Sequence, residues 1–455
     1  PLNFPSSFNN VHKLLILFMF INLYGNLFIL DVFSFKMISK FLQNITPRDY
    51  QKAIFETCVQ KNCLVVLPTG IGKTLIALML TIERLEKYPG EKVLFLAPTK
   101  PLVEQHLNYF KKHLPELFAD MQLFIGSIKP GQRKKTWNTS DIIFSTPQCI
   151  ANDLKKGLYN LSEVCLLIED EAHRCIKNYD YNYVARKYQD QAKNPRIIGL
   201  TASPGSDAAK ISEICKNLSI EAVELRTRIS EDVKPYLQEL EFEKIIVPFP
   251  SEFEEIRQTL RSLFEGYISE LKKRNVLFRP PTKTNLIALQ KSIMGSIARG
   301  NKNFNYLLAA SACAQSIKIQ HALELLETQT PSSFNKYLKN LFDQAAKKKS
   351  RGTAKLVAKP EFNFVFMASN ELLIKGFEHP KTTTLLEIIN KNPKTKTIIF
   401  TQFRETATEI AKKLNSIKNI KAKIFVGQAK KAGFGLTQKE QKSIIQDFEA
   451  GKINC

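Results

Sequence analysis

The sequence has 455 residues, which exceeds what one hydrophobic core usually organises and predicts two or three domains. Its 44% hydrophobic and 24% charged residues are typical of a soluble globular protein and exclude a disordered chain. Eight scattered cysteines in a chain of this length exclude a disulfide framework and predict reduced thiols in a cytoplasmic protein. The formal net charge of +23 indicates a polyanionic partner, most simply nucleic acid, unless lysine is spread evenly over the surface.

The first 36 residues form an apolar leader. Leu14 to Phe33 is a run of 20 residues, long enough to cross a bilayer, and the lysines on its two sides favour neither orientation. A membrane anchor is one interpretation. The other, which we favour, is a non-native segment, because the chain begins with Pro1 and Met37 opens a stretch of soluble character. We therefore expect the natural start at Met37 and no membrane attachment.

Five short apolar runs between Cys63 and Ser203 each end in a polar loop marked by Gly, Pro, Ser or an acid. They are CLVVLPTG, KVLFLAPT, DIIFSTP, VCLLIEDE and RIIGLTAS, with helical patterns between them such as Leu75 to Tyr88 and Leu102 to Leu114. Strands without polar alternation, separated by helices, predict an α/β fold whose parallel sheet is covered on both faces. In such sheets ligands bind at the carboxyl ends of the strands, where all five loops fall.

The loop LPTGIGKT, Leu67 to Thr74, follows the first of these strands and opens a helix. Leu67 stands where the simplest phosphate-loop pattern has Gly, and the remaining positions fit that pattern. The glycines allow backbone N–H groups to approach phosphate oxygens, and the helix N-terminus favours the anion. Lys73 can neutralise the β- and γ-phosphates and Thr74 can ligate Mg²⁺. The spacing therefore predicts a nucleotide site.

Three carboxylates, Glu169, Asp170 and Glu171, follow one another at the end of a buried strand. Their mutual repulsion and desolvation cost stability, so the strand end is expected to lie beside a cation. We predict that Asp170 ligates Mg²⁺ together with Thr74, directly or through water, and that Glu171 orients and deprotonates the attacking water. Glu169 is expected to point away from the site, and the sequence offers no physical account of a carboxylate there.

The pattern changes after the last of these strands. A connector over 206–250 contains Glu241 to Pro248, which we expect to be a crossing strand. Helical periodicity follows from Ser251 to about Lys359, for example over Phe253 to Lys273 and Tyr306 to Glu327.

The helical region carries a concentrated positive charge. Between Ser251 and Lys359, 19 Lys and Arg stand against 8 Asp and Glu, which contradicts an even spread over the surface. The densest piece is KKKSRGTAKLVAK, Lys347 to Lys359, which we expect to form a loop. Such a run is either a solvated face or a nucleic-acid contact, in which case Lys347, Lys348, Lys349 and Arg351 are its candidate contact residues.

A second α/β pattern begins near His379. We expect helices over Leu385 to Asn390, Glu405 to Asn415 and Thr437 to Glu449, strands in KTIIFTQF (396–403) and KAKIFVG (421–427), and the start of another strand in GKINC (451–455).

Taken together, these motifs resemble those of superfamily 2 helicases of the DEAH type. They are RDYQ (48–51), PTGIGKT (68–74), APTKPL (97–102), STPQ (145–148), DEAHR (170–174), TAS (201–203), IIFTQFRET (398–406) and FVGQA (425–429). The resemblance runs from about Ile45 to the end of the chain and is most similar to archaeal Hef helicases and Fanconi-anaemia M translocases. It implies two RecA-like lobes with a helical insertion between them, ATP and Mg²⁺ as cofactors, and ATP-driven work on forked or branched DNA.

The resemblance also implies roles for individual residues. Residues that it assigns to ATP are Arg48 and Gln51, for the adenine, and the phosphate loop of Pro68, Thr69, Gly70, Ile71, Gly72, Lys73 and Thr74. Hydrolysis is assigned to Lys73, Asp170, Glu171 and His173, and coupling to lobe movement to Thr201 and Ser203, with His173 bridging toward them. Nucleic-acid contacts are assigned to Thr99, Lys100 and Thr146 in the first lobe and to Thr401, Arg404 and Gln428 in the second.

The resemblance predicts a division into the leader (1–36), lobe one (37–205), the connector (206–250), a basic helical insertion (251–375) and a partial lobe two (376–455). Two further family motifs, one carrying the arginines that reach the γ-phosphate, are not in the sequence, so we expect this chain by itself to be inactive in hydrolysis. Family members also have a nuclease domain, and sliding-clamp or nuclease partners are not visible here. Two other functions stay open: an ATPase activated by double-stranded RNA, and a nucleotide-dependent nucleic-acid-binding module without turnover.

Overall fold

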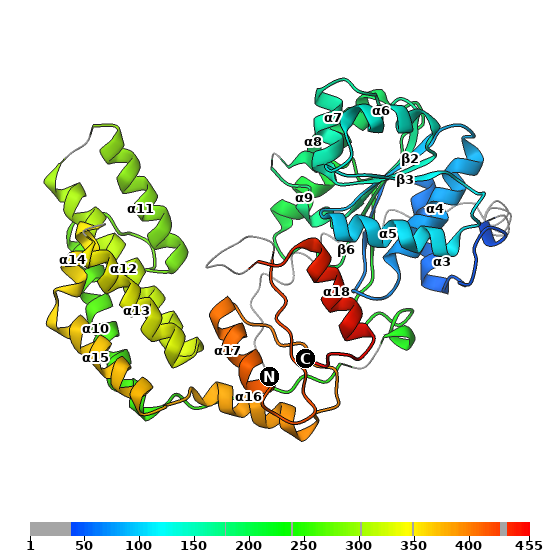
Figure 1. Cartoon of the computed structure of the whole chain (residues 1–455). Helices are drawn as coiled ribbons and strands as arrows, with labels where there is room; N and C mark the ends of the chain where they lie inside the picture. Colours follow the sequence, from blue (N-terminus) through cyan, green and yellow to red (C-terminus); the bar gives the residue numbers. More distant parts are fainter. Residues whose placement is uncertain (1–37, 178, 238–239, 301–302, 348–349, 428–434) are drawn as a thin grey trace. The chain divides into compact units, whose positions relative to one another are not determined.

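The structure is a computed structural model that describes residues 38–455, except 178, 238–239, 301–302, 348–349 and 428–434. The chain forms two compact units, one ending at Glu241 and the other beginning at Phe242 (Figure 1). The leader predicted over 1–36 lies outside the described residues. None of the described helices is both long enough and apolar enough to span a membrane.

Unit 1 is built on a parallel seven-stranded sheet with the strand order β3-β4-β2-β5-β6-β1-β7. The strands are β1 (Cys63–Val66), β2 (Lys92–Leu96), β3 (Met121–Phe124), β4 (Ile142–Ser145), β5 (Val164–Asp170), β6 (Ile197–Thr201) and β7 (Ala222–Leu225). The helices are α3 (Asp49–Gln60), α4 (Lys73–Lys87), α5 (Lys100–His113), α6 (Pro130–Thr139), α7 (Pro147–Lys155), α8 (Asp180–Gln191) and α9 (Ala208–Asn217). The predicted α/β fold with a doubly covered parallel sheet is confirmed.

Successive strand residues face opposite sides of the sheet, which gives unit 1 two hydrophobic cores. On one side Val65 and Phe95 pack with α3, α4 and α5. On the other side Leu64 and Leu94 pack with α6, α7, α8 and α9. Both faces are apolar, so the central strands lack polar alternation, and this is the property from which the sequence predicted them.

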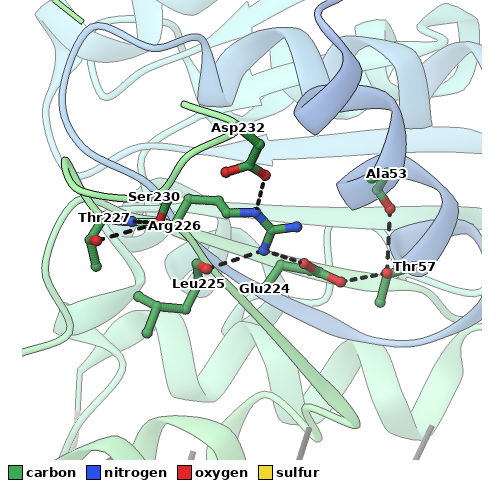
Figure 2. Close-up of polar contacts among 8 residues, drawn as sticks. All are labelled: Ala53, Thr57, Glu224, Leu225, Arg226, Thr227, Ser230 and Asp232. Carbon is green, nitrogen blue, oxygen red and sulfur yellow. Dashed lines mark hydrogen bonds and ion pairs between the residues drawn. The ribbon is translucent and has the colours of Figure 1, made fainter. Parts of the chain in front are cut away.

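The two outer strands, β3 and β7, were not predicted from the sequence. Each has four residues, and none of the four in β7 is fully buried. Polar contacts hold β7 in place (Figure 2): Thr57 Oγ1 on α3 donates to Glu224 Oε1 at 2.6 Å, and Arg226 Nε lies 2.6 Å from Asp232 Oδ2. The backbone N–H of Arg226 also donates to the Val66 carbonyl oxygen at 2.9 Å, at the point where β1 leads into the phosphate loop.

Unit 2 contains a helical bundle followed by a smaller helical group. The bundle consists of α10 (Ser251–Lys273), α11 (Lys283–Ala298), α12 (Phe304–Thr328), α13 (Pro331–Ala346), α14 (Arg351–Val357) and α15 (Pro360–Ile374), which share one core. The smaller group consists of α16 (Pro380–Lys391), α17 (Arg404–Leu414) and α18 (Gln438–Glu449). Its core contains Ile389, Ile410, Leu414 and Ile420. These helices match the helical periodicity predicted after Ser251 and the helices predicted after His379.

The predictions for the connector and for the basic stretch were wrong. Glu241 to Pro248 is not a strand, because no backbone hydrogen bond joins this segment to a neighbour among the described residues, and Phe242 is 91% exposed. The basic stretch after Lys347 is not simply a loop, because α14 begins at Arg351. The Ser350 hydroxyl accepts a hydrogen bond from the Thr353 N–H at 3.3 Å and caps this helix, while Leu356 is fully buried in the bundle core.

The strands predicted over 396–403 and 421–427 are not formed as strands, although the segments do begin to pair. Thr397 N donates to Asn454 O at 2.9 Å, and Lys423 N donates to Cys455 O at 2.9 Å. In the same region Ile398 and Phe400 are 66% and 92% exposed.

Candidate active site

The phosphate loop joins β1 to α4 at the carboxyl edge of the sheet. Gly70 and Gly72 have φ angles of +85° and +82°, in the left-handed region that favours glycine. At Gly72 a second restriction applies, because a Cβ atom there would lie 2.4 Å from Nε2 of Gln51. Any other residue at Gly72 would be strained by the left-handed φ and would also displace the Gln51 amide, so the loop conformation at the N-terminus of α4, where an anion is favoured, depends on glycine.

Lys73 is the first residue of α4, and its side chain turns back over the loop. Its Nζ donates hydrogen bonds to the carbonyl oxygens of Leu67, at 2.9 Å, and Pro68, at 3.3 Å. Burial lowers the pKa of Lys73, while the negative charges of Asp170 and Glu171 act in the opposite direction. The ammonium group is thus placed among acceptors that a phosphate oxygen can replace.

Asp170 ends β5, next to β6 in the sheet, and is 7% exposed. Its Oδ2 lies 2.9 Å from Nε2 of His106, a residue of α5 to which sequence reasoning gave no role. Glu171 follows with a φ of +55° and begins a short 3₁₀ helix (Ala172–Arg174). This left-handed residue turns the chain sharply, so that the Glu171 side chain faces His173.

His173 lies between the ends of β5 and β6. Its Nδ1 lies 3.1 Å from Glu171 Oε2 and 3.3 Å from Thr201 Oγ1. Thr201 is buried, and its Oγ1 also accepts a hydrogen bond from the Ser203 N–H at 3.2 Å. One chain of contacts therefore connects the expected hydrolytic carboxylate to both expected coupling residues.

Glu169 points to the other face of the sheet, as the sequence predicted. Its Oε2 accepts a hydrogen bond from the Cys175 thiol at 2.9 Å, within the core that contains α8 and α9, while Oε1 has no partner among the described residues. Burial raises the pKa of Glu169 to about 8, against the smaller effect of the Cys175 hydrogen bond. At neutral pH the group is therefore largely a neutral acid, which is why the core tolerates it.

Arg48 and Gln51, which were expected to bind adenine, lie together with Tyr50 and Tyr236. Gln51 Nε2 donates to the carbonyl oxygens of Ile71 at 3.2 Å and Gly72 at 3.3 Å, and Tyr50 Oη donates to Ile71 O at 2.6 Å. The guanidinium of Arg48 lies 4.4 Å from the centroid of the Tyr236 ring. Sequence reasoning missed Tyr236, whose one visible feature is an aromatic ring beside Pro235 in the connector.

The predicted nucleic-acid residues of unit 1 share one edge of the sheet. Thr99 and Thr146 are the N-cap residues of α5 and α7, after β2 and β4, and the hydroxyl of neither makes a capping hydrogen bond. Lys100 is half-buried, and its Nζ lies 3.6 Å from Glu104. Two hydroxyls and an ammonium group are thus presented at the same edge of the sheet as the phosphate loop.

The predicted nucleic-acid residues of unit 2 are more scattered. Thr401 is half-buried, and Arg404 Nη2 donates to Gly427 O at 3.3 Å. Lys347 is the C-cap residue that follows α13, and Arg351 begins α14. Gln428, Lys348 and Lys349 lie outside the described residues.

The residues at the edge fit a magnesium nucleotide. Within the described ranges no group of three or more His, Cys, Asp or Glu side chains could hold a metal by itself. Mg²⁺ in nucleotide enzymes does not need such a group, because it binds one or two protein oxygens together with phosphates and water. The Thr74 hydroxyl and the Asp170 carboxylate are oxygen donors of that kind, and Lys73 supplies the additional positive charge.

Comparison with known proteins gives family matches for three parts of the chain. Residues 48–211 match the family model "DEAD/DEAH box helicase" and residues 380–455 match "Helicase conserved C-terminal domain". Residues 252–371 match "Putative ATP-dependent RNA helicase, helical bundle". The bundle and the second α/β pattern are therefore recognised family domains.

Curated relatives match along most of this chain. A Methanocaldococcus jannaschii protein named "Putative ATP-dependent RNA helicase MJ1505" is 38% identical, over 90% of this chain and 51% of its own length. The "Fanconi anemia group M protein homolog" of Mus musculus is 31% identical, over 90% of this chain and 22% of its own. An "ATP-dependent DNA helicase mph1" of Neurospora crassa is 31% identical, over 90% and 37%. The chain thus spans about half the length of these relatives, or less.

The crystal structure of the Pyrococcus furiosus Hef helicase domain is similar in both fold and sequence. It is 39% identical with a TM-score of 0.68, and the match covers 91% of this chain and 86% of that one. Its fold accounts for the RecA-like sheet of unit 1 and for the helical domain that follows. The chain belongs to the Hef and Fanconi anaemia M family of superfamily 2 helicases.

Proposed function

We propose that the protein is an ATP-dependent DNA helicase or translocase that acts on forked or branched DNA in replication-fork repair. The main support for this proposal is that the expected ATP residues and the expected nucleic-acid residues lie at the same edge of one sheet. The phosphate loop, Asp170 and Glu171 lie at the ends of β1 and β5, and Thr99 and Thr146 lie at the ends of β2 and β4. The Neurospora crassa relative, which is named an ATP-dependent DNA helicase, supports DNA as the substrate.

The residues divide the hydrolysis of ATP among them. Thr74 and Asp170 would hold Mg²⁺, which would neutralise negative charge on the bound nucleotide. Lys73 turns from the loop carbonyls to the phosphates, and Glu171 orients a water molecule and takes up its proton. The water oxygen forms a bond to the γ-phosphorus as the bond to the bridging oxygen breaks, and ADP leaves with that electron pair.

The response to hydrolysis follows the chain of contacts beyond Glu171. His173 contacts Glu171 and Thr201 at once, so loss of the γ-phosphate alters the surroundings of the loop that carries Ser203. Thr99, Lys100 and Thr146 hold the backbone of one strand. These contacts carry no information about junctions, because every phosphodiester is alike to them.

The basic helical insertion supplies the preference for branched DNA. Its excess of positive charge is well separated in sequence from the hydrolysis residues. Part of that charge flanks the segment that joins α13 to α14, and the rest is elsewhere in the insertion. We expect it to neutralise phosphates of a second duplex arm. Removing one lysine or arginine that binds a phosphate should then reduce the slope of log K against log salt by roughly 0.9.

The test is fork binding by a quadruple variant. Replacing Lys347, Lys348, Lys349 and Arg351 with Ala should weaken binding of forked DNA of any sequence and flatten its salt dependence. ATPase activity saturated with single-stranded DNA should change little. Four exposed lysines of unit 1, Lys111, Lys112, Lys134 and Lys135, make a matched control, because their removal changes the net charge equally. Equal fork affinity and an unchanged salt slope in the first variant would contradict the proposal.

A second candidate is an ATPase that acts on RNA. Both the Methanocaldococcus jannaschii relative and the family model of the bundle carry RNA helicase in their names. One experiment distinguishes the two candidates: the stimulation of ATPase activity is measured with forked DNA and with duplex RNA of the same sequence. Stronger stimulation by duplex RNA would favour the second candidate.

A further inference from the structure

A histidine ties helix α5 to the carboxylate at the end of β5. His106 Nε2 lies 2.9 Å from Asp170 Oδ2, and each of the two side chains is 10% exposed. Because an ionised carboxylate can only accept, the proton of this bond belongs to Nε2. The imidazole also packs against Phe95 of β2, with ring centroids 4.5 Å apart, so its position is set from two sides.

A second histidine on the same helix shows what a purely structural role involves. His113 is also buried, and its Nδ1 lies 2.8 Å from the carbonyl oxygen of Gln43, while its ring packs against Tyr109 with centroids 4.6 Å apart. That histidine satisfies a backbone group. His106 instead directs its N–H to a carboxylate that the hydrolysis of ATP requires in one orientation.

We propose that His106 is a positioning residue of the hydrolysis site. It holds Oδ2 of Asp170, so that the second carboxylate oxygen is presented to magnesium. Carboxylates that bind metals are generally held by such hydrogen bonds, whose loss costs 10- to 100-fold in metal affinity or activity. This inference rests on the proposed function, because it needs a magnesium nucleotide at this edge.

The same hydrogen bond gives α5 a second role. Thr99 occupies the N-cap position and Lys100 begins the helix, and His106 follows six residues later, roughly 9 Å along the axis. A helix is stiff over that distance, so a displacement of its N-terminus by a bound strand moves the imidazole as well. Nucleic-acid binding at Thr99 and Lys100 is thereby connected to the geometry of the metal ligand, and the ATPase activity responds to DNA partly through His106.

Three variants, made in the complete protein, test this. His106→Phe keeps a ring against Phe95 and removes the N–H, His106→Gln can still donate a hydrogen bond, and His113→Phe is the matched control on the same helix. The first measurement is binding of a fluorescent, non-hydrolysable ATP analogue as Mg²⁺ is titrated. We expect the half-saturating Mg²⁺ concentration to rise about tenfold or more in His106→Phe, by less in His106→Gln, and not at all in His113→Phe.

The second measurement is the stimulation of ATPase activity by single-stranded DNA, given as the ratio of rates with and without DNA. This ratio should fall in His106→Phe and stay at the wild-type value in His113→Phe. An unchanged ratio beside a raised Mg²⁺ requirement would overturn the connection to α5.

The same measurements distinguish a failure of the proposed function from a failure of the role proposed for His106. If the wild-type chain bound no magnesium nucleotide, the proposed function would be wrong and this inference with it. If the wild type bound it and His106→Phe shifted the Mg²⁺ dependence by less than twofold, or no more than His113→Phe did, the positioning role alone would be overturned.

Discussion

Nδ1 of His173 lies 3.3 Å from Oγ1 of Thr201, which connects the ends of two neighbouring strands through one side-chain contact. Because His173 follows β5 and Thr201 ends β6, a change after one strand can reach the end of the other without any movement of the sheet. A contact of this kind is better placed to transmit the effect of ATP hydrolysis from one strand end to the next than to take part in hydrolysis.

We therefore expect variants of this pair to separate hydrolysis from unwinding. His173→Ala and Thr201→Val should keep most of the DNA-stimulated ATPase activity and lower the number of base pairs opened per ATP severalfold. Thr201→Ser, which keeps the hydroxyl, is the control and should stay near the wild type. A parallel loss of ATPase and unwinding in His173→Ala would show that the histidine serves hydrolysis directly.

The two carboxylates at the site should respond differently to neutralisation. Glu171→Gln removes the proton acceptor and should lower hydrolysis by about 10² to 10⁴, while Mg-ATP still binds. Asp170→Asn should abolish hydrolysis and also raise the Mg²⁺ concentration needed for nucleotide binding. Single-turnover rates and equilibrium binding, measured on the complete protein, separate the two effects. Loss of Mg-ATP binding in Glu171→Gln would reverse the assignment.

The third carboxylate, Glu169, should be dispensable for activity. Leu has nearly the same size, it removes the unpartnered Oε1, and it leaves only the weak thiol donor of Cys175 without its acceptor. We expect Glu169→Leu to unfold at the same denaturant concentration as the wild type or a higher one, with ATPase activity within about twofold to threefold, since the site's own contacts are intact. If Glu169→Leu were as inactive as Glu171→Gln, the assignment of sheet faces would be wrong.

Tyr236 should contribute to nucleotide recognition through Arg48. A cation over an aromatic ring at an exposed position is worth about 0.5 to 1 kcal/mol, so Tyr236→Ala should weaken ATP binding roughly twofold to fivefold. Tyr236→Phe keeps the ring and should bind like the wild type. Tripolyphosphate, which lacks the base, should bind both variants equally, and an equal loss of its affinity in Tyr236→Ala would point to the phosphate loop instead.

His379 should make part of the stability of unit 2 dependent on pH. It is 3% exposed, caps α16 by accepting a hydrogen bond from the Lys381 N–H at 3.2 Å, and burial lowers its pKa to about 4, with the Lys381 charge adding to the effect. The neutral form is favoured in the folded state, so its contribution is complete above the unfolded pKa of about 6.5 and is lost as pH falls toward 4.

The neutral His379 side chain contributes up to about 3 kcal/mol to the free energy of unfolding. His379→Asn keeps a capping acceptor and does not titrate, so the difference in unfolding free energy between variant and wild type should change between pH 7 and pH 5. Chemical denaturation at both pH values measures it, and a constant difference would mean that His379 does not titrate in this window.

The sequence predicted those parts of the fold whose residues are buried in one consistent pattern. The five central strands are apolar on both faces, and the phosphate loop needs glycine at fixed positions, so both can be recognised locally. The outer strands β3 and β7 are half-buried and short, and α14 depends on a Ser350 cap and a buried Leu356 that a basic stretch conceals. The hydrogen bond between His106 and Asp170 spans 64 positions, and no local pattern reports it.

The short, charged edge strands of the unit 1 sheet affect what happens when several copies of the protein lie close together. A strand at an edge offers unpaired N–H and C=O groups to any other chain, and short, charged edges discourage that pairing. Here β7 carries Glu224 and leads into Arg226, whose side chains are held in ion pairs, and β3 follows Asp120, which accepts hydrogen bonds from Gln122. The described sheet therefore has no long apolar edge to which a second molecule could add a strand, and copies of unit 1 gathered along one polyanion can stay separate.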